Sequence, residues 1–452
     1  MPTLTQVKYT NPKIGKTLKI VGIVLAALIL VTVGIYVLHR SGLLAKKEDT
    51  DARSYTMTPE MSQITMESDL HTGYLFSRTQ KILQEDRGTD PWVVNWYVIP
   101  GTTRTVPAMQ SGYVDAFDQV LLLETYVSEG NRSKADSLMK AIDDELCCED
   151  GTLRAFIRLP KRDQVEYADG SIYENDVFEQ LDQAPVSMKA TNRYLRALLN
   201  YYDRWGEKKV LNRIKDLAAI VFGSESSTSY KAADRIAAPT PIPVTEKSLV
   251  PEVTEEETNP SGVVSQTGIE LSSLDLEALR RTAVLLPEYQ EKYEALVQIV
   301  KDGKISENLP LYAWMYLDEE SYTYYAGSEM SVELVPSLYT MVYLAEIGEM
   351  DQSSYAWVSG QIYNSGYLFS SYDLISGEAT TETEALEAYP LVMYLAMIKG
   401  DEELFEATFS AMMRNYATLD TSEALYMYFR EVENGRIAVY ARENLLAEIY
   451  IR

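Results

Sequence analysis

The chain has 452 residues, of which 41 are Lys or Arg and 67 are Asp or Glu, so its formal net charge at pH 7 is −26. So acidic a surface repels a phosphate backbone, which excludes nucleic acid as a partner. The chain holds only two His and two Cys, the latter being the adjacent Cys147 and Cys148. We therefore expect no disulfide framework, no zinc or copper centre and no cofactor.

The amino-terminal stretch predicts a membrane anchor. Residues 20–38 carry no charge, and at about 1.5 Å per residue they cross the roughly 30 Å hydrocarbon core. We expect a cytoplasmic tail at 1–19, a transmembrane signal anchor at 20–39 and a juxtamembrane linker at 40–69. The tail has lysines and no acid, which favours an inside amino terminus. The expected location is the cell membrane, with a single pass and a large extracellular domain.

A cleaved signal peptide is the alternative interpretation of this stretch. The apolar run is longer than the usual length of about 7–15 residues, and no small-x-small cleavage site follows it. The sequence therefore favours an uncleaved anchor.

Four later segments share one pattern, in which an apolar helix ends at a glycine and a second helix follows. The glycines are Gly130, Gly206, Gly348 and Gly400. The first helix of each pair is apolar on most of its circumference and the second carries a one-sided stripe, which is typical of an inner helix covered by an outer one. The uneven spacing of the pairs favours a closed ring over an open solenoid. We therefore predict an all-α fold, an (α/α)6-type toroid of helical hairpins over residues 70–452, preceded by the transmembrane helix.

Residues 223–268 interrupt this pattern. They are rich in Ser, Thr, Glu and Pro, a composition that buries too little apolar area to order itself. We predict a disordered insertion at 223–268. It could separate two domains, but the same hairpin pattern on both sides favours one toroid interrupted at a loop.

The loops between the hairpins are rich in aromatic residues, and the chain has 33 Tyr against 9 Phe. A hydroxylated ring suits a wet groove that stacks sugar rings better than a dry core. The alternative is that the rings plug the ends of the helical barrel. The residues predicted to contact substrate are Trp92, Trp96, Tyr113, Tyr173 and Tyr372, with Asp176 and Asp373 for sugar hydroxyls.

Three carboxylates are candidates for catalysis. Asp115 and Asp118 are three residues apart in the run VDAFDQVLLL, where apolar neighbours raise the pKa of a carboxyl group, as a general acid requires. They could instead be first-turn charges that favour the helix dipole. Glu382, Glu384 and Glu387 stand at the start of a late inner helix. We expect most of these acids to cap the helix or to face solvent. Glu384 is the one of this run that we predict to reach substrate.

Several segments resemble the (α/α)6 glycoside hydrolases of family 8 and their diverged relatives. They are SGY at residues 111–113 with the following AFDQ, YLRALLNYYDRWGEKKVL at 194–211, and SGYLFSSYDLISGEATTETEALEAYPLVMYLA at 365–396. The resemblance implies a polysaccharide partner and, since such relatives often accompany bacterial exopolysaccharide systems, a link to exopolysaccharide machinery.

The catalytic motifs of that family are not matched. Met109 and Gln110 stand where its general-acid glutamate is sought, and Lys189 and Thr191 fall at the two aspartates of its D-G-D motif. Acid/base hydrolysis needs two carboxyl groups that flank the bond. The pair would therefore have to come from relocated carboxylates such as Asp115, Asp118 and Glu384.

The resulting hypothesis is a membrane-anchored extracellular glycoside hydrolase-like protein that acts on a bacterial polysaccharide with two carboxylates. Two alternatives stay open: a catalytically inactive glycan-binding accessory of exopolysaccharide synthesis or export, and a helical protein-interaction scaffold without a sugar site. Whether the chain is an enzyme at all is therefore undecided by its sequence, and its expected partners are polysaccharide, the lipid bilayer and exopolysaccharide machinery.

Overall fold

The computed structural model describes most of the chain beyond residue 47. The described residues are 48–67, 92–98, 109–111, 113–158, 164–166, 172–174, 184, 186–223, 240–243, 263–266, 268–317, 322–324, 331–432 and 436–451. The transmembrane helix predicted at 20–39 and the candidate Asp176 lie outside them. No helix of the described segments is long and apolar enough to cross a membrane.

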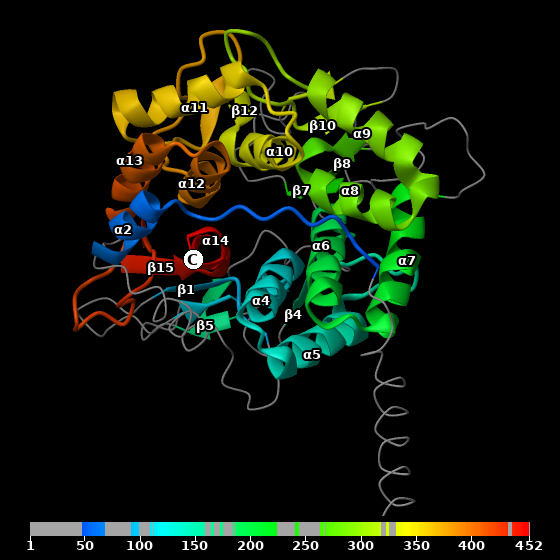
Figure 1. Ribbon diagram of the computed structural model, residues 1–452. Coiled ribbons are helices and arrows are strands. Elements are labelled where there is room, and N and C mark those ends of the chain that lie inside the picture. The colour runs from blue at the N-terminus through cyan, green and yellow to red at the C-terminus, as the bar shows by residue number, and fades with distance from the viewer. Residues whose placement is uncertain are drawn as a thin grey trace, which may run out of the picture.

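An inner ring of helices forms the centre of the molecule (Figure 1). In the described residues it consists of α4 (Ala116–Glu129), α6 (Met188–Trp205), α8 (Leu276–Leu285), α10 (Leu334–Ile347), α12 (Ala388–Lys399) and α14 (Ala441–Tyr450). Each helix packs against the next, and α14 returns to α4, so the ring is closed. The predicted all-α toroid of the (α/α)6 type is thereby confirmed in its helical part.

An outer layer of helices covers this ring. It contains α5 (Arg132–Ala141), α7 (Lys208–Phe222), α9 (Gln290–Asp302), α11 (Gln352–Ser365) and α13 (Glu402–Met413), with α2 (Pro59–Glu67) packed on α13. Helix α4 is buried from Ala116 to Val127, whereas α5 buries only Ala135 and Leu138. The division into inner and outer helices is therefore the one that the sequence predicts.

The four predicted hairpin turns are confirmed at Gly130, Gly206, Gly348 and Gly400. Each glycine ends its inner helix in the left-handed conformation, with φ between 68° and 84°, which side chains with a Cβ rarely adopt. A fifth hairpin, α8 to α9, was not predicted. Its turn has no glycine: Leu286, with φ −130° and ψ 80°, follows α8, and Pro287 opens the short helix η5 (Pro287–Tyr289).

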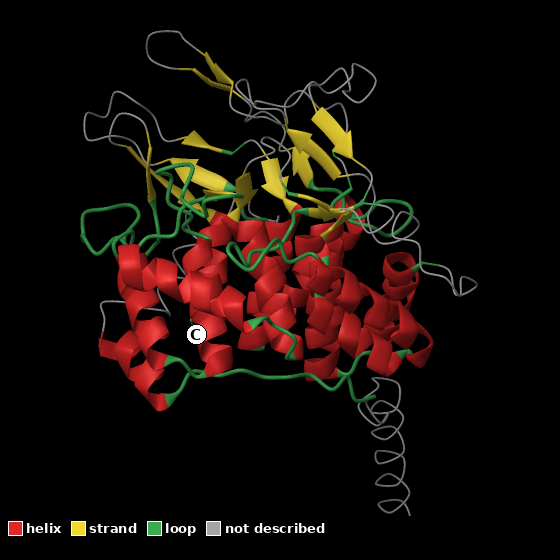
Figure 2. Cartoon of the chain, turned by 90° about the horizontal axis from the view of Figure 1, so that it is seen from above, coloured by secondary structure: helices red, strands yellow, loops and turns green. Residues whose placement is uncertain are grey.

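Short antiparallel strands lie on one side of the ring (Figure 2). They pair as β3 (Tyr113–Asp115) with β4 (Phe156–Arg158), β12 (Ser331–Glu333) with β13 (Ser371–Asp373), β5 (Gln164–Glu166) with β6 (Ile172–Glu174), and β7 (Thr240–Pro243) with β8 (Val263–Gln266). Two larger sheets have the orders β14 (Arg430–Val432), β15 (Arg436–Tyr440), β1 (Trp96–Val98), β2 (Met109–Gln110), and β11 (Tyr322–Thr323), β10 (Met315–Tyr316), β9 (Ile269–Glu270).

The strands mark the end of the ring where the inner helices begin. Strand β3 leads directly into α4, β12 into α10 and β15 into α14, while β9 reaches α8 through the short helix η4 (Leu271–Ser273). We call this end of the toroid the mouth. Between the ends of the insertion predicted at 223–268, the structure describes only strands β7 and β8.

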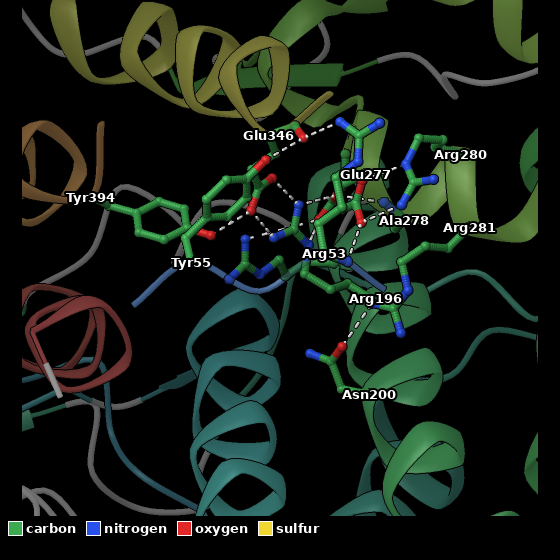
Figure 3. A network of polar contacts seen from close by, with 12 residues as sticks. Arg53, Tyr55, Arg196, Asn200, Glu277, Ala278, Arg280, Arg281, Glu346 and Tyr394 are labelled. Carbon is green, nitrogen blue, oxygen red and sulfur yellow. Dashed lines mark hydrogen bonds and ion pairs between the residues drawn. The ribbon is translucent and has the colours of Figure 1, made fainter. Parts of the chain in front are cut away.

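A buried ionic network fills the axis of the ring below the mouth. Arg196 of α6 donates to Asp275, the residue that caps α8, at 2.6 Å. It also donates to Glu346 of α10 at 2.7 Å, and the Tyr394 hydroxyl of α12 donates to Glu346 at 3.0 Å (Figure 3). One turn earlier on α6, Arg193 donates to Glu124 of α4 at 2.8 Å and to Tyr450 of α14 at 3.3 Å. Five of the six described inner helices thus carry a side chain of this polar network, and the sixth, α8, is capped by one.

An extended segment, residues 48–58, crosses the end of the ring opposite the mouth (Figures 1 and 2). We call it the strap. The Arg53 guanidinium and the Tyr55 hydroxyl both donate to the backbone carbonyl of Glu346, at 2.8 and 2.9 Å, and the Thr50 hydroxyl donates to Asp203 at 2.7 Å. The strap lies within the linker predicted at 40–69, and it is held on the toroid by these contacts.

We expect the strap to stabilise the toroid measurably. The double variant Arg53→Ala/Tyr55→Phe removes both donors from a part-buried carbonyl, and leaving that acceptor unsatisfied costs about 1–3 kcal/mol of unfolding free energy. Urea denaturation measures the loss. The control is Lys140→Ala, which removes an exposed ion pair with Asp144 and should leave the free energy of unfolding nearly unchanged. Equal losses in the two variants would contradict a stabilising role for the strap.

Candidate active site at the mouth of the toroid

Three aromatic residues predicted to contact substrate are buried. Trp92 and Trp96 are only 2% and 7% exposed and belong to the hydrophobic interior. Tyr372 is 1% exposed, its hydroxyl accepts a hydrogen bond from the Phe369 backbone N–H at 3.0 Å, and its ring packs edge-on against Trp357. In the structure these rings support the mouth and present no open face for stacking.

The other predicted contact residues lie in the strand layer. Tyr113 is on β3 and Tyr173 on β6. Asp373 ends β13, where its carboxylate accepts from the backbone N–H groups of Ser376 and Ile375 at 2.7 and 3.0 Å. These hydrogen bonds lower the pKa of Asp373. In the structure the Asp373 carboxylate therefore stabilises the turn that follows β13.

Glu384, the carboxylate predicted to reach substrate, is engaged with neighbouring side chains. It accepts from the Tyr389 hydroxyl, from Arg414 at 3.1 Å and from the Asn415 amide at 3.4 Å. Arg414 is the residue that ends α13. These contacts tie the loop before α12 to an outer helix.

Asp115 and Asp118 share one cation at the start of α4. Asp115 is the N-cap of that helix, accepting from the backbone N–H groups of Phe117 and Asp118 at 2.8 and 3.2 Å, and it pairs with Arg442 at 2.8 Å. Asp118 is fully buried and accepts from Arg442 and Asn95, each at 2.9 Å. Burial raises the pKa of Asp118 to about 7, although Arg442 opposes the shift. One carboxylate thus caps the helix, and the other is sealed from solvent.

Five charged residues meet where the inner helices begin, and we call them the mouth cluster: Asp115, Lys189, Glu270, Glu387 and Arg442. Each is partly exposed. Burial lowers the pKa of Lys189, and the carboxylates of Glu270, Glu387 and Asp115 act in the opposite direction. The three carboxylates are therefore close enough to the Lys189 ammonium to act on it electrostatically, although they come from distant parts of the sequence.

Aromatic rings hold the Lys189 side chain in the centre of this cluster. Its Nζ lies 4.0 Å from the ring centroid of Tyr339 and 5.2 Å from that of Phe117. The Tyr339 hydroxyl is buried and has no hydrogen-bond partner among the residues that the structure describes. A buried hydroxyl without a partner is costly, so a donor or acceptor of a bound molecule would be favourable here.

Glu387 differs from the other acids of the mouth cluster. It precedes α12, and its side chain makes no capping hydrogen bond there. It contributes to the pKa shifts of Lys189, Tyr339, Arg430 and Arg442, which come from three inner helices and β14. Nothing in the described segments pairs with its carboxylate. Glu387 is therefore an uncommitted acid at the site.

A second buried acid lies behind the cluster. Glu443 is 1% exposed and forms an ion pair with Arg430. Burial raises the pKa of Glu443 to about 7, and Arg430 opposes the shift. The mouth thus has two buried acids that hold protons far above the usual range of a carboxyl group.

This arrangement predicts a pH dependence of stability. The pKa of Asp118 rises from 3.8 in the unfolded chain to about 7 in the fold, so the folded state binds more protons between these values and the free energy of unfolding falls as pH rises from about 4 to about 7. Asp118→Asn removes this contribution, and we expect a shallower slope in urea denaturation at pH 5, 6, 7 and 8. The control is Glu382→Gln at an exposed position; identical slopes in both variants would contradict the prediction.

Sequence reasoning passed over Glu270 and chose Glu384 over Glu387. The signal in the sequence was a charged residue near the start of each inner helix. Because the inner helices run parallel, their first residues come together at one end of the ring. Among the described residues no group of three or more His, Cys, Asp and Glu side chains is arranged to hold a metal ion.

Comparison with solved structures identifies proteins of the same fold. A novel alpha-amylase from Clostridium perfringens is 20% identical with a TM-score of 0.59, covering 83% of this chain and 95% of the other. PssZ from Listeria monocytogenes is 10% identical with a TM-score of 0.51, covering 88% and 97%. The endo-beta-1,4-glucanase CMCax from Acetobacter xylinum is 12% identical with a TM-score of 0.51, covering 85% and 98%. No protein-family model matches the sequence, and no curated protein matches it.

Proposed function

We propose that this protein cleaves a polysaccharide at the mouth of its toroid. The observation that carries the proposal is the mouth cluster. Its partly exposed carboxylates act on the Lys189 ammonium, which lies over the rings of Tyr339 and Phe117. Structures of the same fold include an alpha-amylase and an endo-beta-1,4-glucanase, which agrees with a sugar polymer as the substrate class.

Glycosidic hydrolysis requires one carboxylic acid that protonates the leaving oxygen and one carboxylate that activates water or attacks the sugar. Glu387 supplies one of these groups because its carboxylate is not committed to another partner in the described residues. Glu270 supplies the second, since it is partly exposed and acts on the same lysine. Asp115 is excluded from this pair because it caps α4 and pairs with Arg442.

A second function is favoured by one observation. Lys189 places an ammonium group at the centre of the cluster, where hydrolysis calls for an acid. A toroid that binds a glycan through this lysine without cleaving it would be an accessory protein. The location proposed above from residues 20–38 suits either role: a membrane anchor with the toroid on the extracellular side, beside machinery that makes or exports a polymer.

Product release by the full-length protein tests the proposal. The detergent-solubilised chain is incubated with starch, β-1,4-glucan, xylan and a bacterial exopolysaccharide, and new reducing ends are measured beside calorimetric binding. Cleavage of any of them supports hydrolysis. Binding without new reducing ends supports the accessory role, and neither binding nor cleavage contradicts a sugar site.

A further inference from the structure

Two neighbouring turns form a basic surface at the end of the ring opposite the mouth. One joins α4 to α5 and the other joins α6 to α7. Arg204 of the second turn donates to the Ser128 carbonyl of the first at 3.0 Å, and Arg132 of the first forms an ion pair with Glu207 of the second. We call this surface the basic turns, and its exposed cations are Arg132, Lys134, Arg204, Lys208 and Lys209.

The charge of the basic turns is opposite to that of the rest of the protein. Residues 128–134 and 203–209 hold five Lys or Arg against three Asp or Glu. The other three turns at this end, residues 286–292, 347–352 and 399–403, hold two against seven, and the whole chain has a net charge of −26. An anionic partner is therefore attracted to this one surface and repelled by the others, which favours a partner that meets the protein on a single face.

The two lysines that follow Glu207 carry charge that the fold does not use. Lys208 and Lys209 are exposed at the start of α7, and neither has an ion-pair partner among the described residues. Between them and Arg204 lies Trp205, which is partly exposed. Cations beside an accessible Trp are the combination that is enriched at the interface between a membrane and water.

The strap begins at the basic turns. The Glu48 backbone N–H donates to the Tyr202 hydroxyl at 3.1 Å, and the Thr50 hydroxyl donates to Asp203 at 2.7 Å, both in the last turn of α6. Only nine residues separate Glu48 from residue 39, where the anchor expected from the sequence ends, and nine extended residues span at most about 30 Å. In the membrane-anchored protein proposed above, the basic turns therefore stay within reach of the bilayer.

This short tether favours one orientation of the toroid. Helix α6 has 18 residues, a length of about 27 Å, and the strand layer extends the molecule beyond it at the mouth (Figure 2). With the mouth toward the bilayer, the tether would have to be fully extended to reach Glu48 on the far side. With the mouth away from the bilayer, the basic turns meet the lipid headgroups and the tether is relaxed.

We propose that the basic turns bind the anionic headgroups of the membrane that carries the anchor, so that the toroid rests on the bilayer with its mouth opening away from it. The inference rests on the membrane location proposed above. It does not depend on whether the mouth cleaves its polymer or only binds it. A polymer bound at the mouth would then lie at least the height of the helical ring away from the lipid.

Energy transfer to acceptor dyes on the lipid headgroups tests this orientation. The full-length protein carries Cys147→Ser and Cys148→Ser and one new cysteine for a donor dye, either Ser133→Cys in the basic turns or Ile375→Cys. Ile375 is 74% exposed in the turn after β13, on the side of the mouth. In vesicles of phosphatidylcholine we expect stronger transfer from position 133 than from position 375. Adding phosphatidylglycerol should raise the transfer from position 133 further.

A pair of double variants tests the basic turns themselves. Lys208→Gln/Lys209→Gln should lower the ratio of docked to undocked toroid on phosphatidylglycerol vesicles by up to about thirtyfold, because each cation near an anionic leaflet contributes about a factor of five. The matched control is Lys140→Gln/Lys215→Gln. It removes the same charge from exposed positions on α5 and α7, roughly 10 Å further along these helices, and should dock like the wild type.

The outcomes separate this inference from the proposed function. Transfer from position 133 that phosphatidylglycerol does not raise, or that falls equally in the two double variants, overturns the basic turns as a lipid-binding surface. Stronger transfer from position 375 than from position 133 overturns the orientation. Both results leave the anchor and the site at the mouth standing. A full-length protein that does not float with the vesicles overturns the membrane location, and this inference with it, without touching the polymer assays.

Discussion

Replacing Arg196 by methionine is expected to lower the free energy of unfolding by about 3–5 kcal/mol. The guanidinium of Arg196 is buried between Asp275 and Glu346 and donates to both. Without it, Asp275 keeps the capping hydrogen bond from the Ala278 N–H at 3.0 Å and a 3.9 Å contact with Arg193, and Glu346 keeps the Tyr394 hydroxyl. Two carboxylates would then be buried with too few partners, which is the costly way to break a buried ion pair.

Urea denaturation of the full-length protein measures this loss. The control is Lys301→Met, which removes a pair with Glu349 whose side chains are 40% and 45% exposed, and exposed pairs contribute less than about 1 kcal/mol. Adding Glu346→Gln to Arg196→Met should recover part of the stability, because it removes one unpaired charge. A loss in Arg196→Met no larger than in Lys301→Met would mean that the axial network does not hold the ring together.

Glu387→Gln is expected to lower kcat on the cleaved polymer by about 10²–10⁴-fold, the usual contribution of a general acid or base. The amide keeps the size of the side chain and removes its ability to exchange a proton. KM should change little, because Glu387 makes no hydrogen bond within the described residues that orders the site. Initial rates of reducing-end release at several substrate concentrations separate the two constants.

Glu382→Gln is the matched control for this experiment. Glu382 is exposed and lies five residues earlier on the same segment, so its substitution removes an equal charge without touching the mouth cluster. A kcat that falls equally in both variants would point to the general loss of negative charge. A Glu387→Gln variant with full kcat would remove Glu387 from the reaction and leave the chemistry to Glu270 and another acid.

The helical architecture could be predicted from the sequence because its stop signals are local. Gly130, Gly206, Gly348 and Gly400 end apolar helices with a conformation that glycine adopts readily, and the change from an all-round apolar helix to a striped one follows within a few residues. The α8 to α9 turn at Leu286 and Pro287 lacks this signal. The strands were missed because most have only two or three residues, too few for an alternating pattern.

The site was harder to predict, because it depends on which end of each helix faces the same opening. Trp92 and Trp96 are of the residue type that stacks on sugar rings, yet both are buried. The sequence does not distinguish an aromatic ring in the interior from one that lines a groove. Glu384 and Glu387 are three residues apart, but α12 begins only at Ala388. Reasoning about helix faces therefore did not apply to the segment that carries them.

The strap and the axial network block the route through the ring by which a long polymer could otherwise reach the mouth. The centre of the ring is filled by buried Arg193 and Arg196 with their carboxylate partners, and residues 48–58 cross the end opposite the mouth. A toroid usually suggests a hole through which a chain is threaded, but this ring has no open passage along its described axis. A polysaccharide bound as proposed above would therefore lie across the mouth and enter and leave on the same face, and its interior units would reach Glu387 without a free chain end.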